Sequence, residues 1–209
     1  RNKFKESFIL TQTILQSLEL LLVIKDRIAM ITSMKQYKYY VEQDERANGG
    51  KHNFLYMADE IEKYLMLIRR REYVFYLKKE SPHNVIYKVY NKYLKYRIHK
   101  LGLKLGFGIP INCAGPGLRI DHYGFVAINS NAKIGKNCHI YGDITIGVKD
   151  PTNDAAPVIG DNVVIGAGAR IIGPVKIASN CMIGANAVVT HSFLEEGKNI
   201  AGVPAKVIN

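Results

Sequence analysis

The second half of the chain repeats every six residues. Aliphatic residues recur at this spacing, and small residues often follow them; the aliphatic positions are Ile134, Ile140, Ile146, Ile159, Ile165, Ile171, Ile177, Ile183 and Val189. Neither an α-helix nor an alternating β-strand has a period of six. A parallel β-helix does, because each hexapeptide forms one short strand with its turn and stacked coils bury the aliphatic column. The repeat predicts a β-helix over residues 105–209, but a scaffold alone does not define a reaction.

The count of six is interrupted once, between Ile146 and Ile159, which are thirteen positions apart instead of twelve. The intervening segment 147–157 is polar and acidic and contains Asp150 and Asp154. An excursion from a regular solenoid commonly marks its working face. We therefore expect this segment to border a functional site, although its two aspartates suit a solvated turn equally well.

The first half of the chain has helical patterning and carries most of the positive charge. Helices are predicted over residues 8–31, 34–45, 59–79 and 85–104, with Pro82 at the first turn of the last one. Residues 1–104 contain 21 Lys and Arg against 11 Asp and Glu, whereas residues 105–209 contain 8 against 7. Such a basic surface suits a membrane surface or an acidic glycan, and equally a solvated helix face.

The last predicted helix contains four tyrosines at intervals of three residues, namely Tyr87, Tyr90, Tyr93 and Tyr96. They are predicted to form a packing face rather than a platform for stacking bases. No nucleic-acid-binding motif accompanies the lysines between them, so nucleic acid is not expected as a partner.

Cysteine usage and the lack of a visible secretory signal predict a cytoplasmic protein. Cys138 and Cys181 occupy the small inward position of the repeat. With Cys113 the chain has three cysteines, an odd number, and none of them belongs to a CxxC motif. Buried free thiols act as small hydrophobic groups in a reducing compartment. The apolar run Leu18–Ile24 is too short to span a bilayer. Residues 1–29 are interpreted as a helical extension that need not contribute to function, followed by a helical domain (30–104) and a β-helix domain (105–209).

A histidine stands where the repeat predicts an aliphatic residue. Counting back in sixes from Ile134 gives Ile128 and then His122, which follows Asp121. An irregular coil at the edge of the solenoid explains this as well as a function does. The functional alternative is a general base, because histidine titrates near neutral pH and can take a proton from an attacking hydroxyl. His139 is predicted to face outward as a solvated or rim residue rather than to act as a second base. No third histidine has suitable spacing, so no metal site is expected.

Three segments together resemble a known family. The segment Gly117–Gly124, the hexapeptide run and the ending Ala201–Lys206 resemble serine acetyltransferases. They resemble more closely the hexapeptide-repeat sugar O-acetyltransferases of capsule and exopolysaccharide clusters. The resemblance covers about the C-terminal half of the chain. It implies an α+β fold in which helices precede a left-handed parallel β-helix, a homotrimer, and acetyl-CoA in a groove between neighbouring subunits.

The resemblance also implies roles for individual residues. His122 corresponds to the base that deprotonates the acceptor hydroxyl, and Asp121 helps to hold the acceptor. Backbone N–H groups near Gly147 are expected to stabilise the oxyanion. The backbone around Ala167 and Ala185 is expected to contact CoA, and Lys206 to contact one of its phosphates.

Two departures from serine acetyltransferases concern the acceptor. The carboxylate that orients their histidine falls on Phe107 here, which leaves Asp121, Asp143, Asn112 or a backbone carbonyl as substitutes. Their Arg-His pair that grips the amino acid carboxylate falls on residues 155–156, which are both alanine. Losing this charge-assisted contact weakens serine binding. The sequence therefore favours a sugar hydroxyl in capsular or exopolysaccharide biosynthesis. Serine O-acetylation in cysteine biosynthesis and a non-catalytic assembly module are the alternatives.

Overall fold

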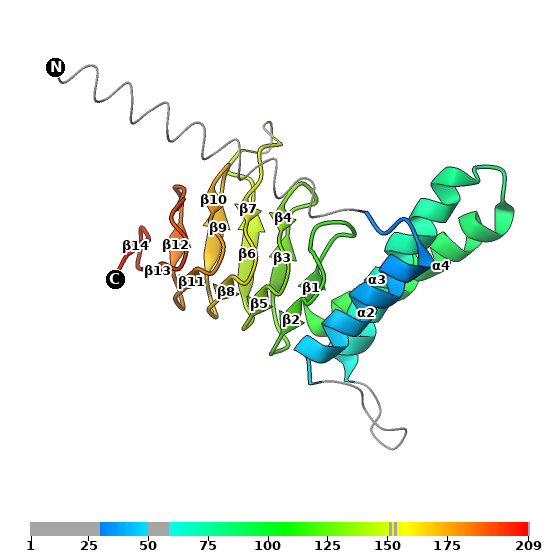
Figure 1. The fold of residues 1–209 in the computed structure, drawn as a ribbon, viewed down its shortest axis with the longest axis horizontal. Coiled ribbons are helices and arrows are strands. Elements are labelled where there is room, and N and C mark those ends of the chain that lie inside the picture. The colour runs from blue at the N-terminus through cyan, green and yellow to red at the C-terminus, as the bar shows by residue number, and fades with distance from the viewer. Residues whose placement is uncertain (1–29, 50–58, 151, 153, 209) are drawn as a thin grey trace.

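The molecule consists of a helical bundle followed by a stack of short strands (Figure 1). The computed structural model describes residues 30–49, 59–150, 152 and 154–208. The helices are α2 (Met34–Ala47), α3 (Glu60–Glu80) and α4 (Val85–Leu105). Three predicted helices are thereby confirmed. The helix expected over residues 8–31 lies outside the described residues, apart from Met30 and Ile31, which are not helical.

Helix α4 has well-defined ends. The Asn84 side chain accepts hydrogen bonds from the N–H groups of Ile86 and Tyr87 at 3.0 and 3.3 Å, and so caps the N-terminus. The sequence predicted Pro82 in the first turn of this helix. It lies instead in the turn that precedes the helix. Gly106 ends the helix with a φ of +80°, a conformation that glycine adopts without strain.

The strands form three sheets, one on each side of the solenoid. The first sheet contains β1 (Phe107–Gly108), β3 (Val126–Ile128), β6 (Ile144–Gly147), β9 (Arg170–Ile172) and β12 (Val188–Val189). The second contains β4 (Lys133–Ile134), β7 (Val158–Ile159) and β10 (Lys176–Ile177). The third contains β2 (Arg119–Ile120), β5 (His139–Ile140), β8 (Val164–Ile165), β11 (Met182–Ile183), β13 (Asn199–Ala201) and β14 (Lys206–Val207). Every strand pair is parallel except β13 with β14.

The parallel register stacks the hexapeptide anchors into columns, as the period predicted. In the third sheet each anchor pairs with the equivalent residue of the next coil, giving the column Ile120, Ile140, Ile165, Ile183 and Ile200. These side chains are at most 3% exposed, so almost all of their apolar surface is removed from water. Cys138 and Cys181 are buried in the same interior, as predicted.

The helical bundle and the first coils share one apolar core. Tyr64 of α3 packs edge-on against Phe107, with ring centroids 5.4 Å apart, and its hydroxyl donates a hydrogen bond to the carbonyl of Phe107 at 3.4 Å. Leu65 and Ile68 of α3 and Ile98 of α4 belong to the same cluster. The bundle is therefore packed onto the end of the solenoid that contains the Asp-His motif.

Candidate active site

Asp121 and His122 lie in an enlarged turn at the edge of the third sheet. Ile120 stacks on Ile140, and the N–H of Asp121 donates to the carbonyl of Ile140 at 3.0 Å. Ile120 thus fills the inward position, and the prediction that His122 occupies an aliphatic position is wrong. The reason is that the next anchor, Ile128, comes eight positions after Ile120, whereas consecutive anchors of a regular hexapeptide are six positions apart. His122 is exposed as a result.

The carboxylate of Asp121 has two side-chain partners. Its Oδ1 accepts a hydrogen bond from Arg119 Nε at 2.7 Å, and its Oδ2 lies 2.6 Å from His139 Nε2. His139 is half-buried and stacks on Tyr141 with centroids 4.5 Å apart, so of the two predicted alternatives it is the rim residue and not the solvated one. Partial burial acts to raise the pKa of Asp121, but the hydrogen bonds from Arg119 and His139 outweigh it. The pKa therefore lies below its ordinary value.

A lowered pKa at Asp121 predicts a pH-dependent contribution to stability. The contribution is fully present above pH about 4, the ordinary value for aspartate, and is lost as the pH falls through the lowered pKa of the folded state. The difference in free energy of unfolding between the wild type and Asp121→Asn should therefore shrink in acid, as measured by urea unfolding across pH. Asp154→Asn, an exposed aspartate of the 147–157 segment, serves as control. A difference for Asp121→Asn that stays constant with pH would contradict the arrangement.

A pocket of about 330 Å³ opens beside Asp121, between the enlarged turn and the helical bundle. Asp59, Glu62 and Asp121 contribute carboxylates to its lining and Arg119 contributes a guanidinium. The Tyr123 hydroxyl donates a hydrogen bond to Asp59, which ties the turn to the start of α3. Sequence reasoning missed the helical residues of this pocket. They belong to no motif, and Asp59 is 64 residues from Tyr123.

The backbone that leads to the Asp-His motif is held by α2 and the loop after it. Asn48 Nδ2 donates to the carbonyl of Leu118 at 2.8 Å, and Asn48 Oδ1 accepts the N–H of Ile120 at 3.1 Å. Asp44 Oδ1 accepts the N–H groups of Gly117 and Leu118 at 2.7 and 2.9 Å. The helical bundle therefore fixes the main chain immediately before the candidate catalytic residues.

Asp44 is also part of a buried ion cluster centred on Arg69 of α3, which is 2% exposed. Arg69 donates from Nε to Asp44 at 2.7 Å and from Nη1 to Glu72 at 3.1 Å. It also donates to the carbonyls of Ala114 and Gly115 at 2.8 and 2.6 Å. Burial raises the pKa of Glu72 above its ordinary value, against the opposing effect of the Arg69 charge. The cluster joins α2, α3 and the first coil.

Within the described residues, none of the side chains proposed to orient His122 forms a hydrogen bond with it. Within residues 30–49, 59–150, 152 and 154–208, the imidazole has no hydrogen-bond partner. Phe107 is buried in the core, and Asp143 forms an ion pair with an arginine of β9 at 3.1 Å. Asn112 Oδ1 is buried without a partner, and Asp121 is occupied by the contacts described above.

The turns after the third sheet place two of the predicted CoA contacts on the corner of His122. Gly142 is the neighbour of His122 in the next coil: a Cβ added to Gly142 would lie 3.5 Å from the Cβ of His122. Ala167 and Ala185 follow in later coils and are exposed. Lys206 is exposed on β14, at the far end of the same sheet.

Gly147 lies at a different corner. It ends β6, so the 147–157 segment connects the first sheet to the second, whereas the turn of His122 connects the third sheet to the first. Within one chain the structure does not bring Gly147 beside His122.

The cysteines are suited to packing and not to chemistry. Burial raises the pKa of the Cys113 and Cys138 thiols to about 12, which disfavours the reactive thiolate. In the part of the chain that the structure describes, no group of three or more His, Cys, Asp or Glu residues is placed to hold a metal ion.

Comparison with known proteins identifies the repeat and its relatives. Residues 156–191 match the family model of the bacterial transferase hexapeptide (six repeats). Serine acetyltransferase of Mycobacterium tuberculosis is 40% identical over 90 residues, which cover 43% of this chain and 39% of that protein. Serine acetyltransferase of Staphylococcus aureus is 36% identical over 132 residues, covering 60% and 62%. The chain thus spans less than two thirds of the length of both relatives.

The fold is shared with solved serine acetyltransferases. The Brucella abortus strain S19 enzyme, solved in complex with coenzyme A, has a TM-score of 0.64 and 24% identity, covering 86% of this chain and 70% of that chain. At this identity the likeness establishes the fold. None of the three relatives supports a glycan acceptor or a membrane contact. The matched repeat, the relatives and the common fold confirm the predicted resemblance: the chain contains bacterial transferase hexapeptide repeats and is similar to serine acetyltransferases.

Proposed function

We propose that the chain forms the core of an acetyl-CoA-dependent O-acetyltransferase whose acceptor is serine. The observation that carries the proposal is the charged pocket lined by Asp121, the residue directly before His122, on a fold shared with serine acetyltransferases. The relatives reverse the ranking that the sequence favoured, in which a sugar hydroxyl came first and serine second.

The pocket offers opposite charges to the two ends of a serine zwitterion. We assign the ammonium group to Asp59 and Asp121, and the carboxylate to Arg119, all of which line the pocket. Arg119 and Asp121 are paired at 2.7 Å, so their side chains are held at the pocket wall before the acceptor binds. Charges that are already in place bind a zwitterion at a smaller cost in side-chain ordering. The hydroxyl is then left for His122 in the adjoining turn.

In the proposed reaction, His122 accepts the proton of the serine hydroxyl while the hydroxyl oxygen bonds to the thioester carbonyl carbon. Backbone N–H groups stabilise the oxyanion that forms. When the C–S bond breaks, the protonated His122 returns the proton to the departing thiolate of CoA. The products are O-acetylserine and CoA, and the enzyme regains its starting protonation state. Acetyl-CoA supplies the activated acetyl group.

The corner that carries His122 suits an elongated co-substrate. Its small residues, Ala167 and Ala185, leave the backbone open to the amides of a pantetheine arm, and Lys206 offers a charge to a phosphate. The proposed oxyanion donors near Gly147 belong to another corner, so they serve His122 only if a second copy supplies them. A homotrimer with acetyl-CoA between neighbouring subunits, and left-handed coils, are therefore parts of the proposal.

The acceptor is tested by following thiol release from acetyl-CoA with L-serine and with a panel of free and N-acetylated hexoses. Serine is expected to give the highest kcat/KM, because only a zwitterion uses both signs of charge in the pocket. Turnover of a sugar without turnover of serine would overturn the assignment of the acceptor. No thiol release with any acceptor, together with no acetyl-CoA binding by calorimetry, would overturn the enzymatic proposal.

Arg119→Gln is expected to raise the KM for serine about 10- to 100-fold, since a hydrogen bond to a charged group contributes about 1.5–3 kcal/mol. The kcat should change less, because the lost contact is made to the ground state and the transition state alike. Arg46→Gln removes an exposed arginine of α2 that pairs with Glu42 and should leave both constants unchanged. A fall in kcat at constant KM would argue against a carboxylate-binding role for Arg119.

A sugar hydroxyl is the second candidate acceptor, and one observation favours it. Ala155 and Ala156 stand where the resemblance places the cationic pair that grips the serine carboxylate, and neither side chain carries charge. A neutral sugar needs no such cation. The comparison of acceptors described above decides between the two candidates.

A further inference from the structure

The outward face of α4 is apolar although nothing in the described chain covers it. Ile86, Val89, Tyr93 and Tyr96 recur every three or four residues, and Leu103 continues the row. Ile86 is 74% exposed, Val89 61% and Leu103 73%. Tyr93 and Tyr96 are exposed as well, whereas Tyr87 and Tyr90 are half-buried, so the predicted packing face of four tyrosines is only partly buried. The opposite side of α4 is buried, so the helix has used one face for the core and presents a second apolar face outward.

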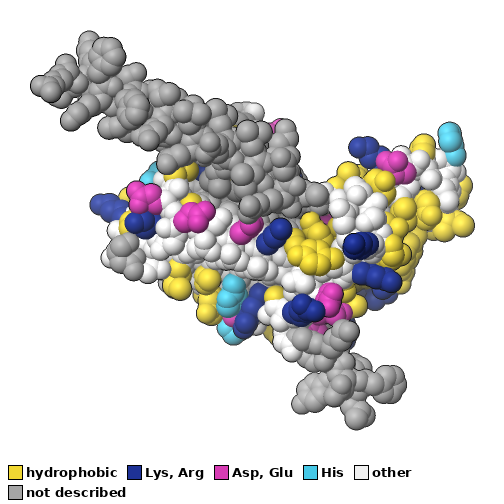
Figure 2. Space-filling view, viewed as in Figure 1, with side chains coloured by type: hydrophobic (Ala, Val, Ile, Leu, Met, Phe, Trp, Pro, Cys, Tyr) yellow, Lys and Arg dark blue, Asp and Glu magenta, His cyan; other side chains and the backbone are white. Residues whose placement is uncertain are grey.

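Cations surround this apolar row. Over its 21 residues α4 contains six Lys or Arg and no Asp or Glu. Lys88, Lys92 and Lys95 are all exposed, as are Arg97 and Lys100. Figure 2 shows basic and hydrophobic side chains gathered together over the helical end of the molecule. A row of apolar residues with basic residues beside it is typical of helices that lie in a membrane interface.

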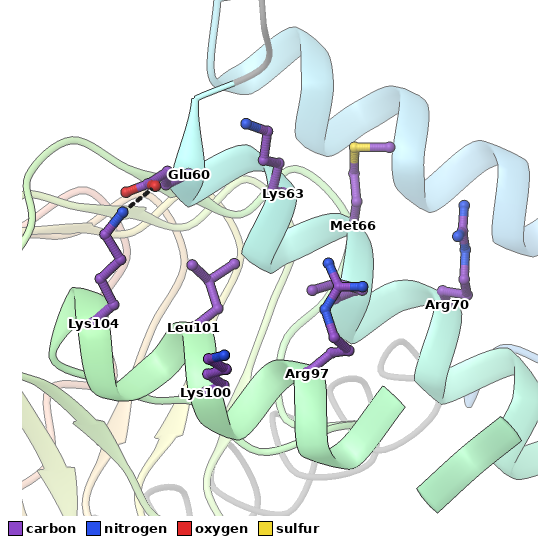
Figure 3. A pocket seen from close by; sticks show the side chains of 9 residues that line it. Glu60, Lys63, Met66, Arg70, Arg97, Lys100, Leu101 and Lys104 are labelled. Atoms are coloured by element: carbon purple, nitrogen blue, oxygen red, sulfur yellow. Dashed lines mark hydrogen bonds and ion pairs between the residues drawn. The ribbon is translucent and has the colours of Figure 1, made fainter. Parts of the chain in front are cut away.

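A basic groove adjoins the apolar row, between α3 and α4 (Figure 3). It has a volume of about 540 Å³. Lys63 and Arg70 of α3 and Arg97, Lys100 and Lys104 of α4 line it around Met66, Leu67 and Leu101. Its single acid, Glu60, forms an ion pair with Lys104. Within the described residues Lys63 and Lys100 have no acidic partner, so the groove has an excess of positive charge available to an anion.

We infer that α4 and this groove bind the surface of an anionic lipid bilayer, with α4 lying parallel to it. A second copy packed row against row would set the six cations of one α4 against those of the other, which is repulsive. A nucleic acid would use the cations but leave the apolar row in water. An anionic bilayer satisfies both, because lipid phosphates pair with the cations while Ile86 and Val89 enter the interface and the tyrosines lie at headgroup level.

The helix lies on the bilayer and does not cross it. Among the described residues, no helix combines the length and apolar character needed to span a membrane. At about 1.5 Å per residue, α4 is about 31 Å long, which gives an extended contact in the plane of the headgroups. This inference is independent of the acceptor, because membrane binding requires no acetyl transfer.

The test is co-sedimentation of the full chain with vesicles of phosphatidylcholine mixed with phosphatidylserine, and with vesicles of phosphatidylcholine alone. Binding is expected only to the mixed vesicles and should weaken with added salt. The triple variant Lys63→Gln/Lys100→Gln/Lys104→Gln should bind about 100-fold more weakly, since each cation near an anionic surface contributes a factor of about five. The variant Ile86→Ser/Val89→Ser should also weaken binding. All five side chains lie at the surface of the helical bundle, and circular dichroism verifies that the helices are retained.

The matched control is Lys136→Gln/Lys149→Gln/Lys198→Gln, which removes the same charge from the solenoid. An equal loss of binding in this control would overturn the inference, because net charge and not the α4 surface would then be responsible. Equal binding to neutral vesicles would also overturn it. So would an unchanged affinity of Ile86→Ser/Val89→Ser for mixed vesicles combined with a changed sedimentation coefficient, which would assign the apolar row to contact between copies of the chain.

Discussion

Replacing His122 by glutamine is expected to lower kcat/KM for acetyl transfer by a factor of about 10²–10⁴, the range that a positioned general base contributes. The fold should be unaffected, because the imidazole is exposed and has no hydrogen-bond partner within the described residues. Thiol release from acetyl-CoA measures the activity, and thermal unfolding followed by circular dichroism measures the stability. Acetyl-CoA binding by calorimetry should persist, which separates loss of the base from loss of the site.

The alternative general base within the same site is His139, whose Nε2 is hydrogen-bonded to Asp121 Oδ2 at 2.6 Å. His139→Gln should therefore weaken acceptor binding by releasing Asp121, and it should leave part of the turnover. His83→Gln, in the turn between α3 and α4, is the control for a histidine outside the solenoid and should behave as wild type. Full activity in His122→Gln together with complete loss in His139→Gln would move the catalytic role to His139.

The period of six was sufficient to predict the solenoid, because every inward anchor from Ile134 to Val189 is an aliphatic residue that must be buried. It failed at the first coil. The turn after Ile120 is two residues longer than a hexapeptide allows, and counting backward through it moved the inward position from Ile120 to His122. A count of sixes contains no information on where a turn is enlarged, since an exposed turn carries no constraint on apolar residues.

The pairing of Asp121 with His139 was not within reach of the sequence. A regular coil of three hexapeptides stacks residues 18 apart, but the enlarged turn makes the stacked residues 20 apart here, so Arg119 and not Asp121 lies opposite His139. The helical side of the site was not within reach either. Asn48 and Asp44 bind backbone atoms of residues 117–120. Because every residue type has the same backbone atoms, the sequence of that segment does not indicate which side chains bind it.

Arg69→Met is expected to lower the free energy of unfolding by about 3–5 kcal/mol, the cost of removing one partner from a buried ion pair. The methionine fills a similar volume, but Asp44 and Glu72 are left without their cation, and the carbonyls of Ala114 and Gly115 lose their donors. Urea unfolding monitored by circular dichroism measures the change. Arg46→Met removes an exposed arginine whose side chain is 66% accessible, and the expected change there is below about 1 kcal/mol.

A double variant separates the charge imbalance from the loss of packing. In Arg69→Met/Glu72→Gln the carboxylate of Glu72 is neutral, so part of the stability lost in Arg69→Met should return if the unpaired charge causes the loss. An effect of Arg69→Met no larger than that of Arg46→Met would show that water reaches the cluster. The folded fraction of Arg69→Met should also transfer acetyl groups more slowly, because Asp44 holds the N–H groups of Gly117 and Leu118, directly before the Asp-His motif. Slower transfer at unchanged acetyl-CoA affinity would establish that the buried cluster of the helical bundle positions the catalytic turn of the solenoid.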